Sequence, residues 1–333
     1  MTKKYYQEID ILKGIAIIMV LLSHAVIYFP INLHEVPVTK AIYDWVGTTH
    51  MPLFFFVSGF CFSYKSERGE YRQFIKKKIY RILIPFLVFN AIDIVPRTTL
   101  SFLVNRPKSL VESLTSILLH GGEYWFLYSL FMVFLFFPLI DRVIRDRKGL
   151  QIATIIICVI LKFVPGIPTV FLIKRTISYL LYFVIGYVLK QNVSFERIRL
   201  TVENNKVISI IVFLLCILCW IVVTPVYVQD YNQLYGIVLA CVGIVWSTII
   251  AILMRWKKGR YWLTEFGKYS LNLYLLNGYT LVFSRTVMVN VLHCNIPLLI
   301  VLVNLIVTLL LGYIITRFVL DRFKLTKMLS GLF

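Results

Sequence analysis

Two histidines lie inside apolar stretches near the start of the chain, where an imidazole is costly unless it has a task. His24 belongs to "EIDILKGIAIIMVLLSHAVIYF", residues 8–29, and His50 to "DWVGTTHMPLFFFVSGFCFSY". Burying a polar group without a partner costs about 1–3 kcal/mol, and ionisable groups inside membrane spans often mark functional sites. A neutral imidazole can take a proton from a hydroxyl near neutral pH. The two histidines therefore predict acid–base chemistry.

The first apolar stretch also carries an acidic and a basic residue, on the helix face that is expected to carry His24. Asp10 and Lys13 precede His24, which lies eleven positions after Lys13. On a helix, eleven residues span about 16 Å and close about three turns, so Lys13 and His24 share a face. We expect this polar stripe to line a cavity that opens to the cytoplasm.

His50 is expected at the same depth as His24. Counted from the cytoplasmic ends of their helices, His24 lies about 21 Å deep and His50 about 20 Å deep. Ser58 and Gly59 lie further towards the cytoplasmic end of the second stretch. Small residues there allow either passage of a narrow ligand or close helix packing, and both interpretations stay open.

A third polar face is predicted in the stretch at residues 80–99. Asp93 falls about 18 Å from the cytoplasmic end, near the depth of the histidines. Its candidate partners are His24, His50 and Arg285. Asp93 could orient a catalytic histidine, or an ion pair between Asp93 and Arg285 could only fix helix packing.

Glu123 and Trp125 mark the outer start of the next stretch, in "HGGEYWFLYSL". A carboxylate beside an aromatic ring can contact a substrate that enters from outside. An aromatic anchor at the membrane interface is the alternative.

The elements that carry these residues are long apolar helices. The chain has 333 residues, of which 59% are hydrophobic, and its apolar residues come in long runs. We predict an all-α, polytopic integral membrane protein with about ten transmembrane helices, the first of them retained because no cleavage site follows it. Residues 1–333 are expected to form a single integral-membrane domain. The predicted spans are 10–30, 42–63, 80–99, 124–141, 151–168, 175–190, 206–226, 233–254, 268–290 and 297–317.

The positive charges indicate the orientation. Of the 35 Lys and Arg residues, 27 lie in the N-terminal segment and in alternate loops. We therefore expect a protein of the cell (plasma) membrane. The positive-inside rule puts both of its termini in the cytoplasm. Anionic lipid headgroups account for most of the net charge of +19, so we expect membrane lipids and no nucleic acid as partners. No residue cluster suggests a metal.

A basic cytoplasmic entrance with histidines deeper in the membrane suits acyl transfer from a coenzyme A thioester. The pantetheine arm spans about 16–20 Å, which matches the spacing from Lys13 to His24. Lys13 and the basic cluster that contains Lys78 and Arg81 could hold the phosphates. His24 would then lie at the thioester, as general base or as acyl relay.

At these residues the sequence resembles the membrane acyltransferase 3 family, in its fucose 4-O-acetylase-like and nodulation-factor acetyltransferase branch. The resemblance covers nearly the whole chain. The matching motifs are the acidic–basic–His pattern at Asp10, Lys13 and His24, HMP at residues 50–52, FFxxSG at residues 54–59, a basic pair at Lys78 and Arg81, WFL at residues 125–127, and "GKYSLNLYLLN".

The resemblance implies an O-acyltransferase that moves an acetyl or other short acyl group from cytoplasmic acetyl-CoA or acyl-CoA to a hydroxyl of a cell-surface or lipid-linked glycan, such as a cell-envelope polysaccharide. It also implies that the first-helix histidine is essential. The chain departs from the family pattern at Lys13 and Lys78, where Arg is usual, and at Asn277, where His is common. Lysine loses the bidentate geometry of arginine. Asn277 cannot act as a base, and with Glu123, Trp125 and Arg285 it is a candidate for substrate binding.

A proton-coupled transporter or flippase of a glycan precursor is the alternative, because buried charges could also carry protons. Such transporters often show inverted repeats and broken helices in pairs, and neither is evident here. Acyl-CoA hydrolysis would distinguish the two classes.

Overall fold

The computed structural model describes residues 6–27, 31–62, 70–99 and 109–332, and within them the chain is helical. Contacts divide it into two compact units, described in turn below. The first comprises Met1–Phe60 and Gly186–Tyr313, and the second Cys61–Ile185 and Ile314–Phe333. The single domain expected from the sequence stays a prediction.

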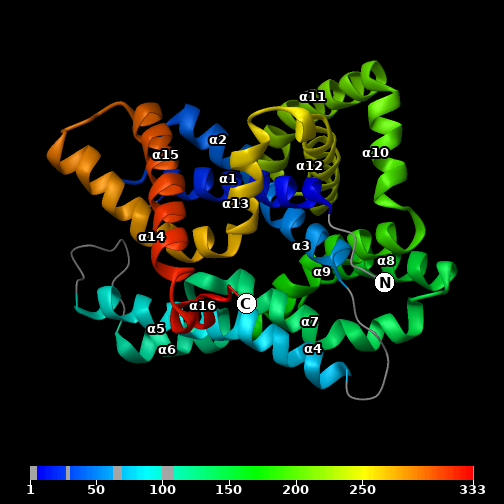
Figure 1. The fold of residues 1–333 in the computed structure, drawn as a ribbon, viewed down its shortest axis with the longest axis horizontal. Coiled ribbons are helices and arrows are strands. Elements are labelled where there is room, and N and C mark those ends of the chain that lie inside the picture. Colours follow the sequence, from blue (N-terminus) through cyan, green and yellow to red (C-terminus); the bar gives the residue numbers. More distant parts are fainter. Residues whose placement is uncertain (1–5, 28–30, 63–69, 100–108, 333) are drawn as a thin grey trace. The chain divides into compact units, whose positions relative to one another are not determined.

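The first unit surrounds helix α1 (Gln7–Ile27), which carries His24. Figure 1 shows α1 in blue, and it packs against five other helices of this unit. These are α2 (Pro37–Gly47), α3 (His50–Phe60), α12 (Gln233–Leu253), α13 (Arg260–Lys268) and α14 (Ser270–Thr286). Most of α1 is buried, including its polar residues Glu8, Asp10 and Ser23, whereas Lys13 and His24 are partly exposed.

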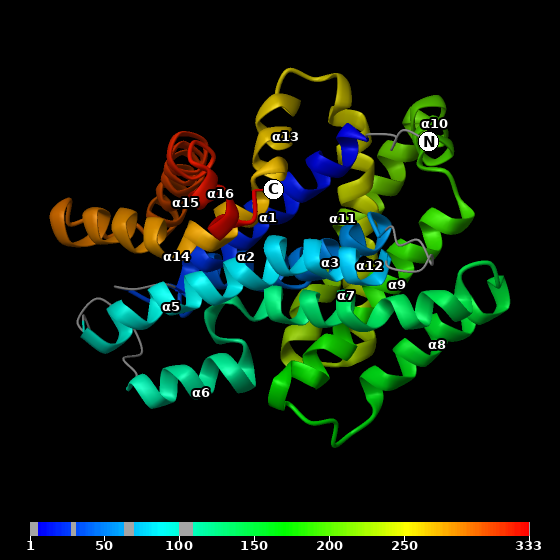
Figure 2. The same cartoon turned by 60° about the horizontal axis from the view of Figure 1, so that its bottom comes forward.

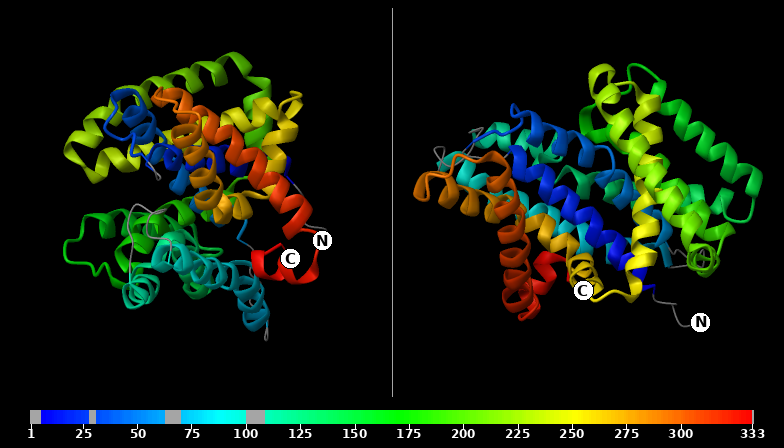
Figure 3. Two further views of the ribbon diagram at one scale, coloured as in Figure 1. Left: turned by 90° about the vertical axis from the view of Figure 1, so that its left-hand side faces the viewer. Right: turned by 90° about the horizontal axis from the view of Figure 1, so that it is seen from above.

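The rest of the first unit frames this group. Helices α11 (Lys206–Asp230) and α12 run side by side as an antiparallel hairpin (Figure 3). The short connection at Tyr231 and Asn232 uses a left-handed residue at Tyr231. The remaining elements are the end of α9 (Ile173–Asn192), α10 (Phe195–Asn204), η5 (Met254–Trp256), η6 (Val287–Val291) and most of α15 (Pro297–Ile315).

The second unit is built from the middle of the chain and its C-terminus. In Figure 2, α6 (Leu110–His120) lies beside α5 (Ile84–Thr99), in agreement with their contacts. An aromatic cluster of Phe62, Phe74, Phe134, Phe137 and Phe183 forms much of its core. The other elements are α4 (Glu70–Lys78), η1 (Ile79–Leu83), η3 (Gly122–Tyr124), α7 (Trp125–Ile144), α8 (Lys148–Phe163), η4 (Val170–Leu172), the first part of α9, η7 (Thr316–Leu320) and α16 (Lys324–Ser330).

The prediction of a helical membrane protein is confirmed in this coarse form. Among the described residues, six helical stretches are long and apolar enough to cross a membrane. They are Gln7–Ile27, Leu110–Ile144, Val170–Asn192, Lys206–Asp230, Gln233–Trp256 and Pro297–Leu320. The full count of about ten spans and the cytoplasmic termini stay predictions.

The predicted span at 42–63 is broken, because α2 ends at Gly47 and α3 begins at His50. Pro52 has no N–H to donate to the carbonyl of Thr48, four residues earlier, and its ring crowds that carbonyl. The Thr48 hydroxyl bonds to the carbonyl of Trp45 at 2.9 Å and also accepts from the indole N–H of Trp220 at 2.8 Å. These contacts fix the break that places His50 at the start of α3.

The predicted span at 80–99 begins with the π-helical segment η1 and continues as α5. Pro85 cannot donate to the carbonyl of Arg81, so the ordinary helical hydrogen bond is missing at this position. The turn that carries Arg81 is therefore wider than an α-helical turn.

Candidate active site

His24 lies near the end of α1 and contacts α14 through Asn277. Its Nδ1 is 2.9 Å from the side-chain oxygen of Asn277. The Asn277 amide group is oriented by its own nitrogen, which donates to the carbonyl of Tyr274. Asn277 is 3% exposed, so this orientation is held inside the protein.

This geometry assigns the proton on His24. An amide oxygen only accepts hydrogen bonds, so Nδ1 must donate and carries the hydrogen. In the neutral ring Nε2 then keeps its lone pair. His24 is half-buried and not fully enclosed. An imidazole held in one tautomer, with Nε2 as its basic nitrogen, is the arrangement that a general base needs.

The end of α1 is held by a buried arginine on α14. Arg285 is 0% exposed, and its Nη2 donates to the carbonyl oxygens of Ala25 at 2.5 Å and Val26 at 3.3 Å. The last carbonyls of a helix have no partners within the helix, and a cation there is favourable. Arg285 thus caps α1 one residue after His24. Its roles as partner of Asp93 or as substrate ligand stay predictions.

An apolar cluster holds the same end of α1. Ala25 and Val26 pack with residues of α14, η6, α15 and the segment after α1. The other buried members are Leu33, Leu281, Met288, Ile300 and Val301. Since proteins pack tightly in such clusters, the backbone that carries His24 has little freedom to shift.

His50 is placed by the break between α2 and α3. Its Nδ1 lies 2.7 Å from the carbonyl oxygen of Val46, so Nδ1 donates here too and Nε2 keeps the lone pair. His50 is half-buried, and its helix α3 packs against α1, which carries His24. The structure therefore brings the helices of the two predicted histidines together, and the two rings have the same tautomer. A catalytic role for His50 stays a prediction.

The other end of α1 carries Asp10 and Lys13 close to α13. The Lys13 ammonium lies 3.1 Å from the Asp10 carboxylate, and the Lys13 side chain is 32% exposed. On α13, Lys268 pairs with Glu265 at 2.9 Å. Lys13 is therefore partly open and able to reach an anion, although it already pairs with Asp10.

Ser58 and Gly59 lie at the end of α3, where α9 approaches closely. A Cβ on Gly186 of α9 would collide with the carbonyl oxygen of Phe56 and crowd the amide of Phe60. This contact favours helix packing at this level. Ser58 is half-buried, so ligand contact there stays a prediction.

The remaining predicted residues belong to the second unit. The Lys78 ammonium lies 3.5 Å from the centre of the Phe134 ring, and Arg81 is exposed. Phosphate binding by this basic pair stays a prediction. The ring of Trp125 has the guanidinium of Arg175 4.4 Å from its centre and the ring of Tyr179 at 5.6 Å. Trp125 is thus already in contact with protein groups.

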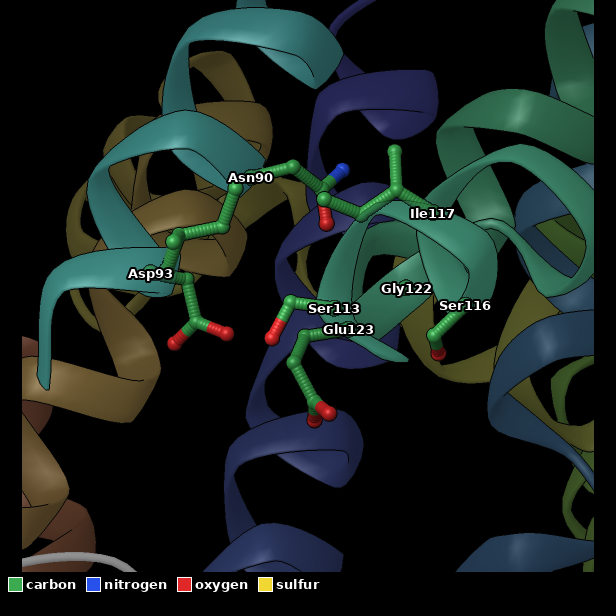
Figure 4. Close-up of a pocket in the computed structure, with 8 residues that line it drawn as sticks. Asn90, Asp93, Ser113, Ser116, Ile117, Gly122 and Glu123 are labelled. Carbon is green, nitrogen blue, oxygen red and sulfur yellow. The ribbon is translucent and has the colours of Figure 1, made fainter. Parts of the chain in front are cut away.

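Asp93 and Glu123 line one hollow of the second unit, together with Asn90 (Figure 4). The predicted role of Asp93 in orienting a histidine stays a prediction. Sequence reasoning missed Ser113 and Ser116, which line the same hollow. Their spacing of three residues on a helix was a signal, because such residues share a face.

Sequence reasoning also missed the contact of Asn277 with His24. Asn277, Thr280 and Ser284 lie three and four residues apart on α14 and are all buried. Polar residues with that spacing indicate a polar helix face, but not what it meets. Among the described residues, no group of three His, Cys, Asp or Glu side chains could hold a metal ion.

The fold and the site define a helical membrane protein with an oriented histidine on its first helix and a second one at the start of α3. The chain belongs to the acyltransferase family, since the family model described as an acyltransferase domain matches residues 6–317. The resemblance deduced from the sequence is thereby confirmed. The protein is a membrane acyltransferase, and the transporter or flippase alternative has no comparable support.

Two relatives are nodulation proteins named NolL. The protein from Sinorhizobium fredii is 26% identical over 290 residues, covering 81% of this chain and 76% of the relative. The protein from Mesorhizobium japonicum is 28% identical over 131 residues, covering 38% of this chain and 33% of the relative. No solved structure matches the chain significantly.

Proposed function

We propose that this membrane acyltransferase moves an acetyl or other short acyl group from cytoplasmic acyl-CoA to a hydroxyl of a cell-surface or lipid-linked glycan. The observation that carries the proposal is the hydrogen bond from His24 to Asn277. It makes Nε2 the basic nitrogen of the neutral ring, on a residue that is only half-buried. The protein would work in the plasma membrane with both termini in the cytoplasm.

In the proposed reaction, Nε2 of His24 takes the proton of the acceptor hydroxyl while the hydroxyl oxygen attacks the thioester carbonyl. The C–S bond then breaks, and the CoA thiolate leaves and takes the proton from the imidazolium. The products are an acyl ester and free CoA, so atoms and charges balance. An acyl relay through His24 would start from the same lone pair.

Acyl-CoA would be held at the other end of α1. Lys13 is partly exposed, and it lies about 16 Å along the helix from His24. A pantetheine arm of about that length would join phosphates near Lys13 to a thioester near His24. Lys78 and Arg81 are the further candidates for the phosphates, and Ser58 and Gly59 for the arm.

The test uses the purified full-length protein in nanodiscs with acetyl-CoA. We expect His24→Ala to lower the release of free CoA by about 100-fold or more with acetyl-CoA binding kept, because a general base contributes about that much. Lys13→Ala should weaken acetyl-CoA binding by about tenfold or more, because one charge-assisted contact is lost.

Two exposed residues supply matched controls. His120→Ala on α6 and Lys148→Ala at the start of α8 remove the same side-chain types at exposed positions, and both variants should bind acetyl-CoA and release CoA like the wild type. Wild-type CoA release by His24→Ala would overturn the proposed mechanism. Failure of the wild-type protein to bind any acyl-CoA would overturn the proposed donor.

A further inference from the structure

Two lysines flank the place where α1 and α13 cross in the first unit. A Cβ on Gly267 of α13 would collide with the carbonyl oxygen of Asp10 and would lie 3.0 Å from the amide nitrogen of Gly14, so the two backbones touch here. Lys268 follows Gly267, and Lys13 precedes Gly14. The two lysines therefore start from neighbouring points of one contact. Their long, flexible side chains allow both ammonium groups to reach one small anion.

Each lysine pairs with a buried carboxylate that helps to fix its position. The Lys13 ammonium lies 3.1 Å from Asp10, and the Lys268 ammonium lies 2.9 Å from Glu265. The carboxylate side chains are 10% and 8% exposed, whereas those of the lysines are 32% and 48% exposed. The other Glu265 oxygen accepts from the Tyr313 hydroxyl at 3.3 Å. An ammonium group has three N–H donors, so each lysine can bind a further anion besides its carboxylate.

An exposed aromatic ring continues this surface along α13. Tyr261, Glu265 and Lys268 have the spacing i, i+4 and i+7, so they share a helix face. The Tyr261 side chain is 57% exposed, and its ring lies roughly perpendicular to that of Trp262, with the ring centres 5.5 Å apart. Tyr261 and Lys268 are about 10 Å apart along the helix. One face of α13 thus carries a cation at one end and a ring for stacking at the other.

This surface matches the chemistry of the nucleotide end of acyl-CoA. That end carries a diphosphate and a 3′-phosphate, which bind lysine ammonium groups, and an adenine ring, which can stack on an aromatic side chain. An anionic lipid headgroup would also suit the two lysines, but it has no heterocycle to stack on Tyr261. The aromatic ring therefore favours a nucleotide.

We infer that α13 binds the nucleotide end of the donor: Lys268 joins Lys13 in holding the phosphates, and the adenine ring stacks on Tyr261. The inference rests on the proposed transfer from acyl-CoA and adds which residues of α13 hold the donor. The pantetheine arm then runs along α1 towards His24, which shares the helix face of Lys13 about 16 Å away. The backbone contact at Gly267 keeps the two lysines together.

The experiment separates the nucleotide from the arm. Full-length protein in phosphatidylcholine nanodiscs is titrated with acetyl-CoA, with acetyl-pantetheine, which lacks the nucleotide, and with adenosine 3′,5′-bisphosphate, which lacks the arm. We expect Lys268→Ala to weaken binding of acetyl-CoA and of the bisphosphate by about tenfold or more, because one charge-assisted contact is lost. Binding of acetyl-pantetheine should stay unchanged. Lys268→Arg keeps the charge and should bind all three much like the wild type.

Tyr261→Ala should weaken binding of the same two ligands by about fivefold or more, because the stacking of the base is lost. The matched controls are Lys258→Ala in the exposed loop before α13 and Tyr235→Ala on the exposed face of α12, and both should bind acetyl-CoA like the wild type.

Three results would overturn the inference. The first is wild-type affinity for acetyl-CoA in Lys268→Ala. The second is an equal loss of acetyl-pantetheine binding, which would show that Lys268 only supports the fold. The third is an equal loss in Lys258→Ala, which would show diffuse attraction by the basic loop. Binding of phosphatidylglycerol that depends on Lys268, seen by native mass spectrometry without binding of the bisphosphate, would make this a lipid site and overturn the inference as well.

CoA release from acetyl-CoA is measured on the same samples. If the wild type binds acetyl-CoA and releases CoA while Lys268→Ala binds equally well, the assignment to α13 is wrong and the proposed function stands. If the bisphosphate binds through Lys268 and the wild type releases no CoA from any acyl-CoA, the proposed function fails and the nucleotide site stands.

Discussion

At the scale of single residues, the proposed chemistry depends on one hydrogen-bonded pair. Asn277 stands at a position where the family that the sequence resembles commonly has histidine. Its side-chain oxygen accepts a hydrogen bond from Nδ1 of His24. An amide cannot take up a proton as a second base would. It can fix which nitrogen of His24 carries the hydrogen, as the carboxylate does in hydrolase triads. In the proposed mechanism Asn277 is therefore a positioning residue and not a second base.

Asn277→Leu should lower kcat by about tenfold or more and leave the affinity for acetyl-CoA unchanged. The apolar side chain cannot accept from Nδ1, so the ring of His24 loses its fixed tautomer. Asn277→Asp keeps an acceptor oxygen and should recover much of kcat relative to the leucine variant. The measurement is steady-state CoA release beside equilibrium binding of acetyl-CoA.

Asn304→Leu provides the control for this prediction. Asn304 is a buried amide on α15 that bonds to Ser284 at 2.8 Å, so its loss tests general destabilisation. An unchanged kcat in Asn277→Leu, or an equal fall in the leucine variants of both asparagines, would contradict the positioning role.

The sequence predicted much of this site but not its pairing. The spacing of Asp10, Lys13 and His24 in one helix was enough to expect a shared polar face, because local periodicity determines it. The contact between His24 and Asn277 joins residues 253 positions apart. Such a contact is set by how α1 packs on α14, and no local pattern in one sequence reports it. The capping of α1 by Arg285 escaped prediction for the same reason.

At the scale of elements, the position of Lys13 depends on how closely α1 and α13 cross. A Cβ on Gly14 would collide with the carbonyl oxygen of Leu263, and one on Gly267 with the carbonyl oxygen of Asp10. Both helices therefore touch backbone to backbone beside the Asp10–Lys13 pair. The sequence showed the polar stripe of α1 but not this crossing, because the crossing joins distant parts of the chain and no local pattern reports it.

Gly267→Ala should force α1 and α13 apart and destabilise the protein by about 1–3 kcal/mol, the usual cost of overpacking. Because the displaced carbonyl belongs to Asp10, we also expect weaker binding of acetyl-CoA. Thermal unfolding in detergent and acetyl-CoA binding measure the two effects.

Gly259→Ala is the matched control, since an added Cβ there would meet only the end of Met254 at 3.5 Å. It should unfold at the wild-type temperature. Wild-type stability and acetyl-CoA affinity in Gly267→Ala would show that the crossing tolerates a wider separation and does not position Lys13.

At the scale of the whole molecule, hydropathy indicates that the protein lies in a membrane, and charge indicates how it is oriented there. The six long apolar helical stretches among the described residues and the family match place the protein in a membrane. The breaks at Thr48 and before Pro85 explain why apolar runs in the sequence do not all become single long helices. The orientation stays a prediction from the charges, because 27 of the 35 Lys and Arg residues lie in the N-terminal segment and in alternate loops, which is one side of the membrane in the predicted topology.

The orientation predicts that acyl-CoA is accepted from one side of the membrane only. Sealed inside-out vesicles that contain the protein should release CoA from added acetyl-CoA, because Lys13 then faces the added donor. Intact right-side-out vesicles should release almost none, since the anionic nucleotide of CoA does not cross a bilayer. Detergent should restore release in the second preparation, and vesicles with His24→Ala should stay inactive in every case. Equal rates in both intact preparations would contradict the cytoplasmic entrance and, with it, the side on which α1 begins.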